Sequence, residues 1–208
     1  NEQALETLVA AIEKAGFAPG RQVAIALDIA ATDFGKGGRY KLGLEGRELG
    51  TDEMIRMLLG WIAAYPIASI EDPLAEDDAA GFAAFTREVG GRIQVVGDDF
   101  LVTDAARVRR AAAIGAANTV LIKPNQRGTL TEAKAAWDAA REVGFAGIVS
   151  ARSGETEDVT IADIAVATNA GQIKTGSLCR TDRVAKYNQL LRIEEELGDN
   201  AIYGGKMR

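Results

Sequence analysis

The stretch Ile67-Ala68-Ser69-Ile70-Glu71-Asp72-Pro73 places a short apolar run directly before two carboxylates and a proline. Such a run is typical of a parallel strand that is covered on both faces. Five further runs have the same character, at residues 23–29, 93–97, 119–123, 147–150 and 172–175. Longer segments with helical periodicity separate the runs, so the sequence predicts an α/β protein with a parallel sheet.

The segments between the runs carry specific helix signals. Thr129 and Glu132 have the spacing of a capping box, which predicts that a helix begins there. A further helix is expected over residues 184–197. The interval 33–50 is rich in glycine and predicts a small hairpin or loop inserted between a strand and a helix.

Polar residues follow the apolar runs along the chain. In a parallel barrel all carboxyl ends of the strands face one rim, where active sites lie. The residues expected at this rim are Asp28, Glu71, Asp98, Lys123, Arg152, Ser153 and Lys174. Each has a plainer interpretation when taken alone, as a cap, a turn residue or a surface lysine. Their shared position favours a functional site.

Asp28, Glu71 and Asp98 follow three successive strands, and converging carboxylates repel one another unless a cation joins them. Oxygen ligands of this kind suit Mg²⁺. The chain contains no His, so acid–base chemistry would rest on Lys, Asp or Glu. A lysine near a metal and a second lysine is suited to act as a base, which makes Lys123 and Lys174 candidates.

Arg152 and Ser153 precede a helix start and would hold a phosphate. The acidic residues at 155–158 would oppose an anion, and they also have the position of helix caps. We expect both roles, with the cap ordering the loop and the two polar residues facing the rim. Together the residues predict metal-assisted abstraction of a proton beside a carboxylate, on a small phosphorylated or carboxylated substrate.

Composition excludes several other classes. The net charge is −6 and the basic residues are scattered, which argues against nucleic-acid binding. No run approaches the length of a membrane span, and the first residues lack the pattern of a signal peptide. The single Cys179 argues for a reducing compartment, so a cytoplasmic location is expected.

Seven motifs together resemble the C-terminal barrel domain of enolase (phosphopyruvate hydratase). They begin near the start of the chain and end near Gly198. The stretches are Ala26-Leu27-Asp28, Ser69-Ile70-Glu71-Asp72-Pro73, Gly97-Asp98-Asp99, Leu121-Ile122-Lys123-Pro124-Asn125-Gln126, Ser153-Gly154-Glu155-Thr156-Glu157-Asp158, Gly171-Gln172-Ile173-Lys174-Thr175-Gly176 and Ala185-Lys186-Tyr187-Asn188-Gln189-Leu190-Leu191-Arg192-Ile193-Glu194-Glu195.

The resemblance implies a lyase of glycolysis that interconverts 2-phosphoglycerate and phosphoenolpyruvate with Mg²⁺ as cofactor. It implies that Lys123 is the base and that Lys174 holds the substrate carboxylate. The metal ligands would be Asp28, Glu71 and Asp98, with Glu71 also near the substrate. Arg152 and Ser153 would contact the phosphate, as would residue 151. The full-length protein would be a homodimer.

The sequence departs from the family pattern in two ways. Ala151 stands where the family has a His that touches the phosphate region. Six β/α units are visible in residues 1–208, whereas a TIM-type barrel has eight. We also expect that residues 1–208 contain neither the family's N-terminal capping domain nor the residues that serve water elimination. These departures keep two alternatives open: an enolase-like enzyme with an altered substrate, and a non-catalytic module that binds Mg²⁺ or a partner.

Overall fold

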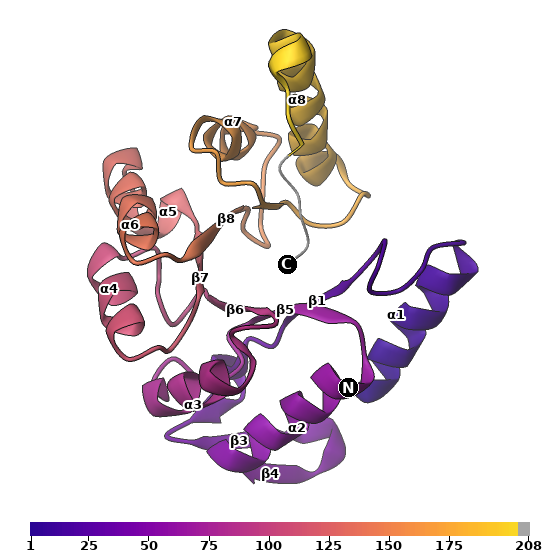
Figure 1. The fold of residues 1–208 in the computed structure, drawn as a ribbon, viewed down its shortest axis with the longest axis vertical. Coiled ribbons are helices and arrows are strands. Elements are labelled where there is room, and N and C mark those ends of the chain that lie inside the picture. The colour runs from indigo at the N-terminus through magenta and orange to yellow at the C-terminus, as the bar shows by residue number, and fades with distance from the viewer. Residues whose placement is uncertain (204–208) are drawn as a thin grey trace. The chain divides into compact units, whose positions relative to one another are not determined.

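The computed structural model of the protein describes residues 1–203, which fall into two compact units. The first unit comprises Asn1–Phe100 and Arg110–Asn118. The second comprises Leu101–Arg109 and the described chain from Thr119 onward. Helices and strands alternate along both units (Figure 1).

Three parallel strands and three helices form most of the first unit. The strands lie in the order β1-β5-β6, and each pairs with its neighbour in parallel. The elements are α1 (Glu2–Lys14), β1 (Ile25–Asp28), α2 (Thr51–Ala64), β5 (Ile67–Glu71), α3 (Ala79–Val89) and β6 (Gln94–Gly97). The apolar runs predicted at 67–70 and 93–97 are confirmed as strands β5 and β6, and the run at 23–29 contains the shorter strand β1.

The core of the first unit forms between its strands and helices because both present apolar side chains there. Ile70 of β5, Val95 of β6 and Phe82 of α3 are fully buried. The ring of Phe82 stacks on Phe100, with centroids 4.1 Å apart. This close packing fixes the position of the ends of β5 and β6, where the carboxylates lie.

The glycine-rich interval 33–50 folds into a small antiparallel sheet. Its elements are η1 (Ala31–Asp33), β2 (Gly35–Lys36), β3 (Arg39–Leu42), η2 (Gly43–Glu45) and β4 (Arg47–Gly50), with strand order β2-β3-β4. Tyr40 is completely buried, and its hydroxyl donates to Asp78 at 2.8 Å and accepts from the Ala75 N–H at 3.2 Å. A Cβ at Gly35 would overlap the Tyr40 ring, so glycine is required at that position.

The second unit repeats the alternation with the strand order β7-β8-β9, again parallel. Its elements are β7 (Thr119–Ile122), α5 (Pro124–Arg127), α6 (Leu130–Glu142), β8 (Ala146–Ser150), α7 (Thr160–Ala167), β9 (Ile173–Lys174), α8 (Thr181–Leu197) and η3 (Gly198–Asn200). Helix α4 (Ala105–Ala113) has residues in both units.

Local signals predicted two helices of the second unit, α6 and α8. Thr129 caps α6, accepting from the Glu132 N–H at 3.2 Å, while the Glu132 carboxylate accepts from the Thr129 hydroxyl at 2.7 Å. The predicted capping pair is confirmed, with its second bond made between side chains. Helix α8 ends at Leu197 with Gly198 as its C-cap, as expected, and it begins at Thr181 rather than at residue 184.

Candidate active site

Asp28 and Glu71 are brought side by side by the pairing of β1 with β5. Their Cα atoms are direct partners in the parallel register, so both side chains project from the same face of the sheet. Glu71 is 5% exposed, whereas Asp28 is exposed and accepts from the Ala30 N–H at 3.1 Å. The two carboxylates therefore share one face at the strand ends, as the sequence predicts.

Asp98 extends this row from the third strand. Glu71 pairs with Val96 in β6, and Asp98 lies two residues further along the chain. Because side chains alternate between faces with a period of two, Asp98 continues the face that carries Glu71. Its side chain is buried, with an exposed fraction of 8%. The first unit thus gathers Asp28, Glu71 and Asp98 at the carboxyl ends of its strands.

Asp72 is a residue of this region that the sequence did not single out. It has a left-handed backbone (φ 40°), which turns its side chain away from the strand direction. Its carboxylate accepts from the backbone N–H of Asp98 at 3.0 Å and of Asp99 at 2.8 Å. Since its own N–H donates to Val96 O at 2.9 Å, Asp72 joins the ends of β5 and β6. Only the folded backbone reveals this role, because the dipeptide Glu-Asp looks like a pair of equivalent acids.

Asp72, Asp98 and Asp99 each offer a carboxylate oxygen, and these atoms lie within 4.8 Å of one another. The pKa of Asp72 is raised to about 7, chiefly by burial and also by the neighbouring carboxylates, while hydrogen bonds from the two backbone N–H groups lower it. A bound proton or cation would reduce the electrostatic repulsion between these carboxylates. With oxygen donors alone and no His in the chain, this acidic region is compatible with Mg²⁺.

The acidic region therefore contains two overlapping sets that meet at Asp98. The set predicted from the sequence consists of Asp28, Glu71 and Asp98. The other set consists of Asp72, Asp98 and Asp99, whose carboxylate oxygens lie close together. Both oxygens of Asp72 already accept backbone hydrogen bonds. We therefore interpret Asp72 as the group that orders the 98–99 backbone.

The second unit carries both candidate lysines on one face. Ser150 of β8 and Lys174 of β9 are direct register partners, and Ile122 pairs with Val149. Lys123 follows Ile122 with extended backbone (φ −118°, ψ 99°), so it falls in the same row as Ser150 and Lys174. Two strand spacings separate the lysine backbones by roughly 10 Å, a gap that two long side chains can span toward one small molecule. Both lysines are half-buried.

Residue 151 and Arg152 lie beside these lysines. The Ala151 N–H donates to Lys174 O at 2.8 Å, which places the position of the expected His next to a candidate lysine. Arg152 is exposed, and its guanidinium donates to the side-chain oxygen of Asn125 at 3.3 Å. Ser153 is exposed on the same loop. The second unit therefore brings Lys123, Lys174, Ala151 and Arg152 into one region.

Thr103 is a further residue that sequence reasoning missed. Its hydroxyl accepts from the Lys123 N–H at 3.0 Å and donates to the Gln126 side chain, and the residue is completely buried. Val102 and Thr103 both have left-handed backbone, with φ of 44° and 52°. This conformation is costly for β-branched residues and clusters at functional sites. No local sequence pattern signals it.

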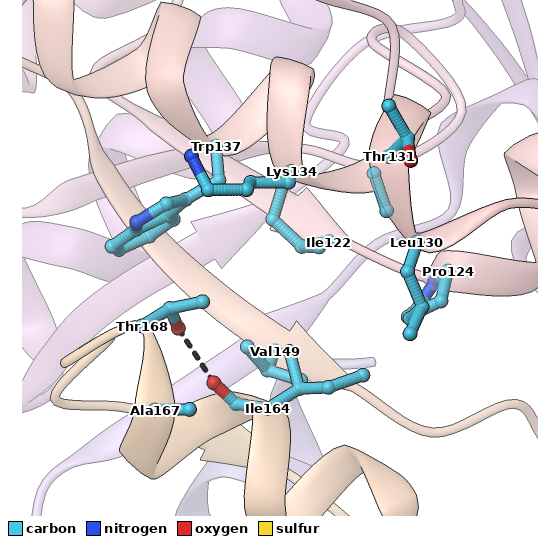
Figure 2. Close-up of a pocket in the computed structure, with 11 residues that line it drawn as sticks. Ile122, Pro124, Leu130, Thr131, Lys134, Trp137, Val149, Ile164, Ala167 and Thr168 are labelled. Carbon is cyan, nitrogen blue, oxygen red and sulfur yellow. Dashed lines mark hydrogen bonds between the residues drawn. The ribbon is translucent and has the colours of Figure 1, made fainter.

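The prominent hollow of the second unit lies elsewhere. Figure 2 shows it between α6 and α7. The hollow has a volume of about 280 Å³ and almost entirely apolar walls. Trp137 and Lys134 come from α6, and Thr168, directly after α7, donates to Ile164 O at 2.7 Å. Ile122 contributes to the hollow, and because successive strand residues point to opposite faces, Lys123 points away from it. The hollow is therefore not the candidate active site.

Among residues 1–203, none of the helices combines the length and the apolar character that crossing a membrane requires.

Parallel strands that alternate with helices, with carboxylates and lysines following the strand ends, define an α/β protein of the TIM-barrel type. A comparison with protein-family models matches residues 1–208 to the family described as "Enolase, C-terminal TIM barrel domain". The match covers the whole chain, so the chain belongs to this family. The resemblance drawn from the motifs is confirmed at the level of the family and of the fold class.

Proposed function

We propose that this chain carries the metal-binding and lysine-base part of an enolase active site, for the Mg²⁺-dependent interconversion of 2-phosphoglycerate and phosphoenolpyruvate. The observation that carries the proposal is the register of the strands. It gathers Asp28 with Glu71 in one unit and Lys123 with Lys174 in the other. Both rows occupy the carboxyl ends of parallel strands, the position of active sites in this fold type.

Asp28, Glu71 and Asp98 would hold Mg²⁺. When bound, the ion would neutralise the carboxylates and stabilise negative charge that develops on the substrate carboxylate. The donor set supports this assignment, because it contains only oxygen ligands and its members share one face of the sheet. Glu71, the most buried of the three, would also contact the substrate, as the family resemblance implies.

Lys123 would remove the proton on the carbon next to the substrate carboxylate. Its backbone N–H is held by Thr103, so the side chain starts from an ordered position. Lys174 would attract the carboxylate as its negative charge increases, and so favour removal of that proton. Arg152 and Ser153 would contact the phosphate, an arrangement that suits the fork of an arginine.

The test is an assay of phosphoenolpyruvate formation by the natural full-length protein, with and without EDTA. We expect turnover to stop when the divalent cation is removed and to return when Mg²⁺ is added. Lys123→Met should lower kcat by about 10²-fold or more, which is the usual contribution of a general base. Lys134→Met is the matched control, because Lys134 lies on α6 with its side chain 67% exposed. Turnover that persists in EDTA would refute the proposal.

A second candidate function is an enolase-like reaction on a different substrate. Ala151 favours it, because this position lies directly beside Lys174 and lacks the imidazole that the family pattern has there. The variant Ala151→His separates the two functions in the full-length protein. A large gain in turnover of 2-phosphoglycerate supports an impaired enolase, and an unchanged rate supports another substrate.

The proposal includes a role in glycolysis, a cytoplasmic setting and a homodimeric full-length protein. The single exposed Cys179 is compatible with a reducing compartment. The homodimer rests on the family resemblance alone. Analytical ultracentrifugation of the full-length protein would test it, since a monomer at micromolar concentration would contradict the assignment.

A further inference from the structure

Lys186 of α8 is a lysine that the proposed chemistry does not use, and it is completely buried. An unpaired ammonium in such a place would be very costly. Its Nζ atom instead donates to the Glu155 carboxylate at 3.0 Å, to Thr156 O at 2.6 Å and to Asp182 O at 2.6 Å. These three bonds use all three protons of the ammonium.

Glu155 continues the connection toward the candidate phosphate contact. Lys186 binds one of its carboxylate oxygens, and the other accepts from the Arg152 N–H at 2.7 Å. The Arg152 guanidinium in turn donates to Asn125, in the turn that follows Lys123. A continuous path of hydrogen bonds therefore runs from the interior of α8 to the loop that carries Arg152.

These contacts also explain why an acidic run follows a proposed phosphate contact. The charge of Glu155 is balanced by Lys186 at 3.0 Å. Asp158 accepts from the Thr160 N–H at 2.9 Å near the start of α7, and this bond holds the pKa of Asp158 below its usual range. The Glu155 charge therefore has a counter-charge, while the ionised Asp158 carboxylate is held at the start of α7, so that both residues shape the loop.

We propose that the Lys186–Glu155 ion pair is a positioning element that sets the Arg152 backbone for contact with the substrate phosphate. This inference rests on the proposed function. Without Lys186, the Glu155 carboxylate would lose its counter-charge and would turn toward Arg152, which it would then neutralise. The motifs at 153–158 and 185–195 thus act together through the contact between Glu155 and Lys186.

The experiment measures kcat and KM for 2-phosphoglycerate in the full-length protein for Lys186→Met, Glu155→Gln and the double variant. Because a charge-assisted contact is lost, we expect KM to rise at least about tenfold in Lys186→Met, while kcat changes less. The double variant should recover part of the loss, since it also removes the unbalanced carboxylate. Lys134→Met, which breaks an exposed ion pair with Asp138, is the matched control and should leave KM unchanged.

Hydrogen exchange at the Arg152 amide gives a readout that does not depend on turnover. We expect faster exchange in Lys186→Met and in Glu155→Gln, because the bond to Glu155 is lost or loosened. If Lys186→Met does not fold, Glu155→Gln decides the question alone. If the wild-type protein shows no turnover, the proposed function is refuted, but hydrogen exchange at the Arg152 amide still tests the positioning role of the ion pair. The inference would be overturned if a variant is destabilised but its KM is unchanged. It would also be overturned if hydrogen exchange at the Arg152 amide is unchanged in the variants.

Discussion

Replacing Thr103 with valine tests whether its hydroxyl orders the backbone of the candidate base. Valine has nearly the same shape and the same β-branch, so it keeps the packing and the left-handed strain at φ 52°. It removes only the oxygen that accepts from Lys123 and donates to Gln126. The change therefore isolates the hydrogen bonds of one completely buried side chain.

The expected magnitude follows from those two bonds. When a buried N–H loses its acceptor, the cost is about 1–3 kcal/mol, and this cost would fall on the Lys123 amide. Thr103→Ser is the matched control because it keeps the hydroxyl and removes one methyl group, at about 1 kcal/mol. Serine also tolerates a left-handed backbone better than threonine, which offsets part of that cost.

Urea unfolding of the full chain measures both effects, and the kcat of the full-length protein reports on Lys123. We expect Thr103→Val to be less stable than Thr103→Ser and to have the lower kcat. If valine is as stable as serine, or if kcat is equal in the two variants, the hydroxyl does not order Lys123 and the reasoning is wrong.

Three further predictions concern stability. The raised pKa of Asp72 means that the folded state holds its proton up to about pH 7, whereas the unfolded state releases it near 3.8. In EDTA, this carboxyl should therefore lower the free energy of unfolding as pH rises from about 4 to about 7, by an amount on the order of a few kcal/mol. Asp72→Asn should flatten that slope in urea titrations at several pH values, and an unchanged slope would contradict the assignment. Gly147→Ala should destabilise the fold by about 1–3 kcal/mol, because the added Cβ would overlap the ring of Trp137. Gly60→Ala should instead stabilise it by about 0.5–1 kcal/mol, since Gly60 lies exposed inside α2 with open space around its Cα; thermal unfolding compares the two alanine variants directly.

The candidate site was predictable to the extent that it depends on strand ends. Glu71 lies at the end of an apolar run in the first unit and Lys123 at the end of one in the second. In a parallel sheet this position alone places each residue at the carboxyl edge of its own unit's strands. Thr103 and Asp72 were not predictable in this way. Their roles depend on backbone angles and on N–H donors elsewhere in the chain. The donor is Lys123 for Thr103, and Asp98 and Asp99 for Asp72.

The succession of strands and helices along the chain, the parallel arrangement and the family resemblance were already present in the amino-acid sequence, because hydrophobic periodicity and strand-end motifs are local properties. The different roles of Glu71 and Asp72 could not be predicted from the sequence. The two residues are neighbours in the chain, but the backbone at Asp72 is left-handed. The Glu71 carboxylate therefore lies in the row of Asp28, whereas the Asp72 carboxylate accepts from backbone N–H groups. The burial of Lys186 likewise depends on three acceptors that meet only after α8 packs. Such roles arise from contacts between distant residues, and folding alone brings those residues together.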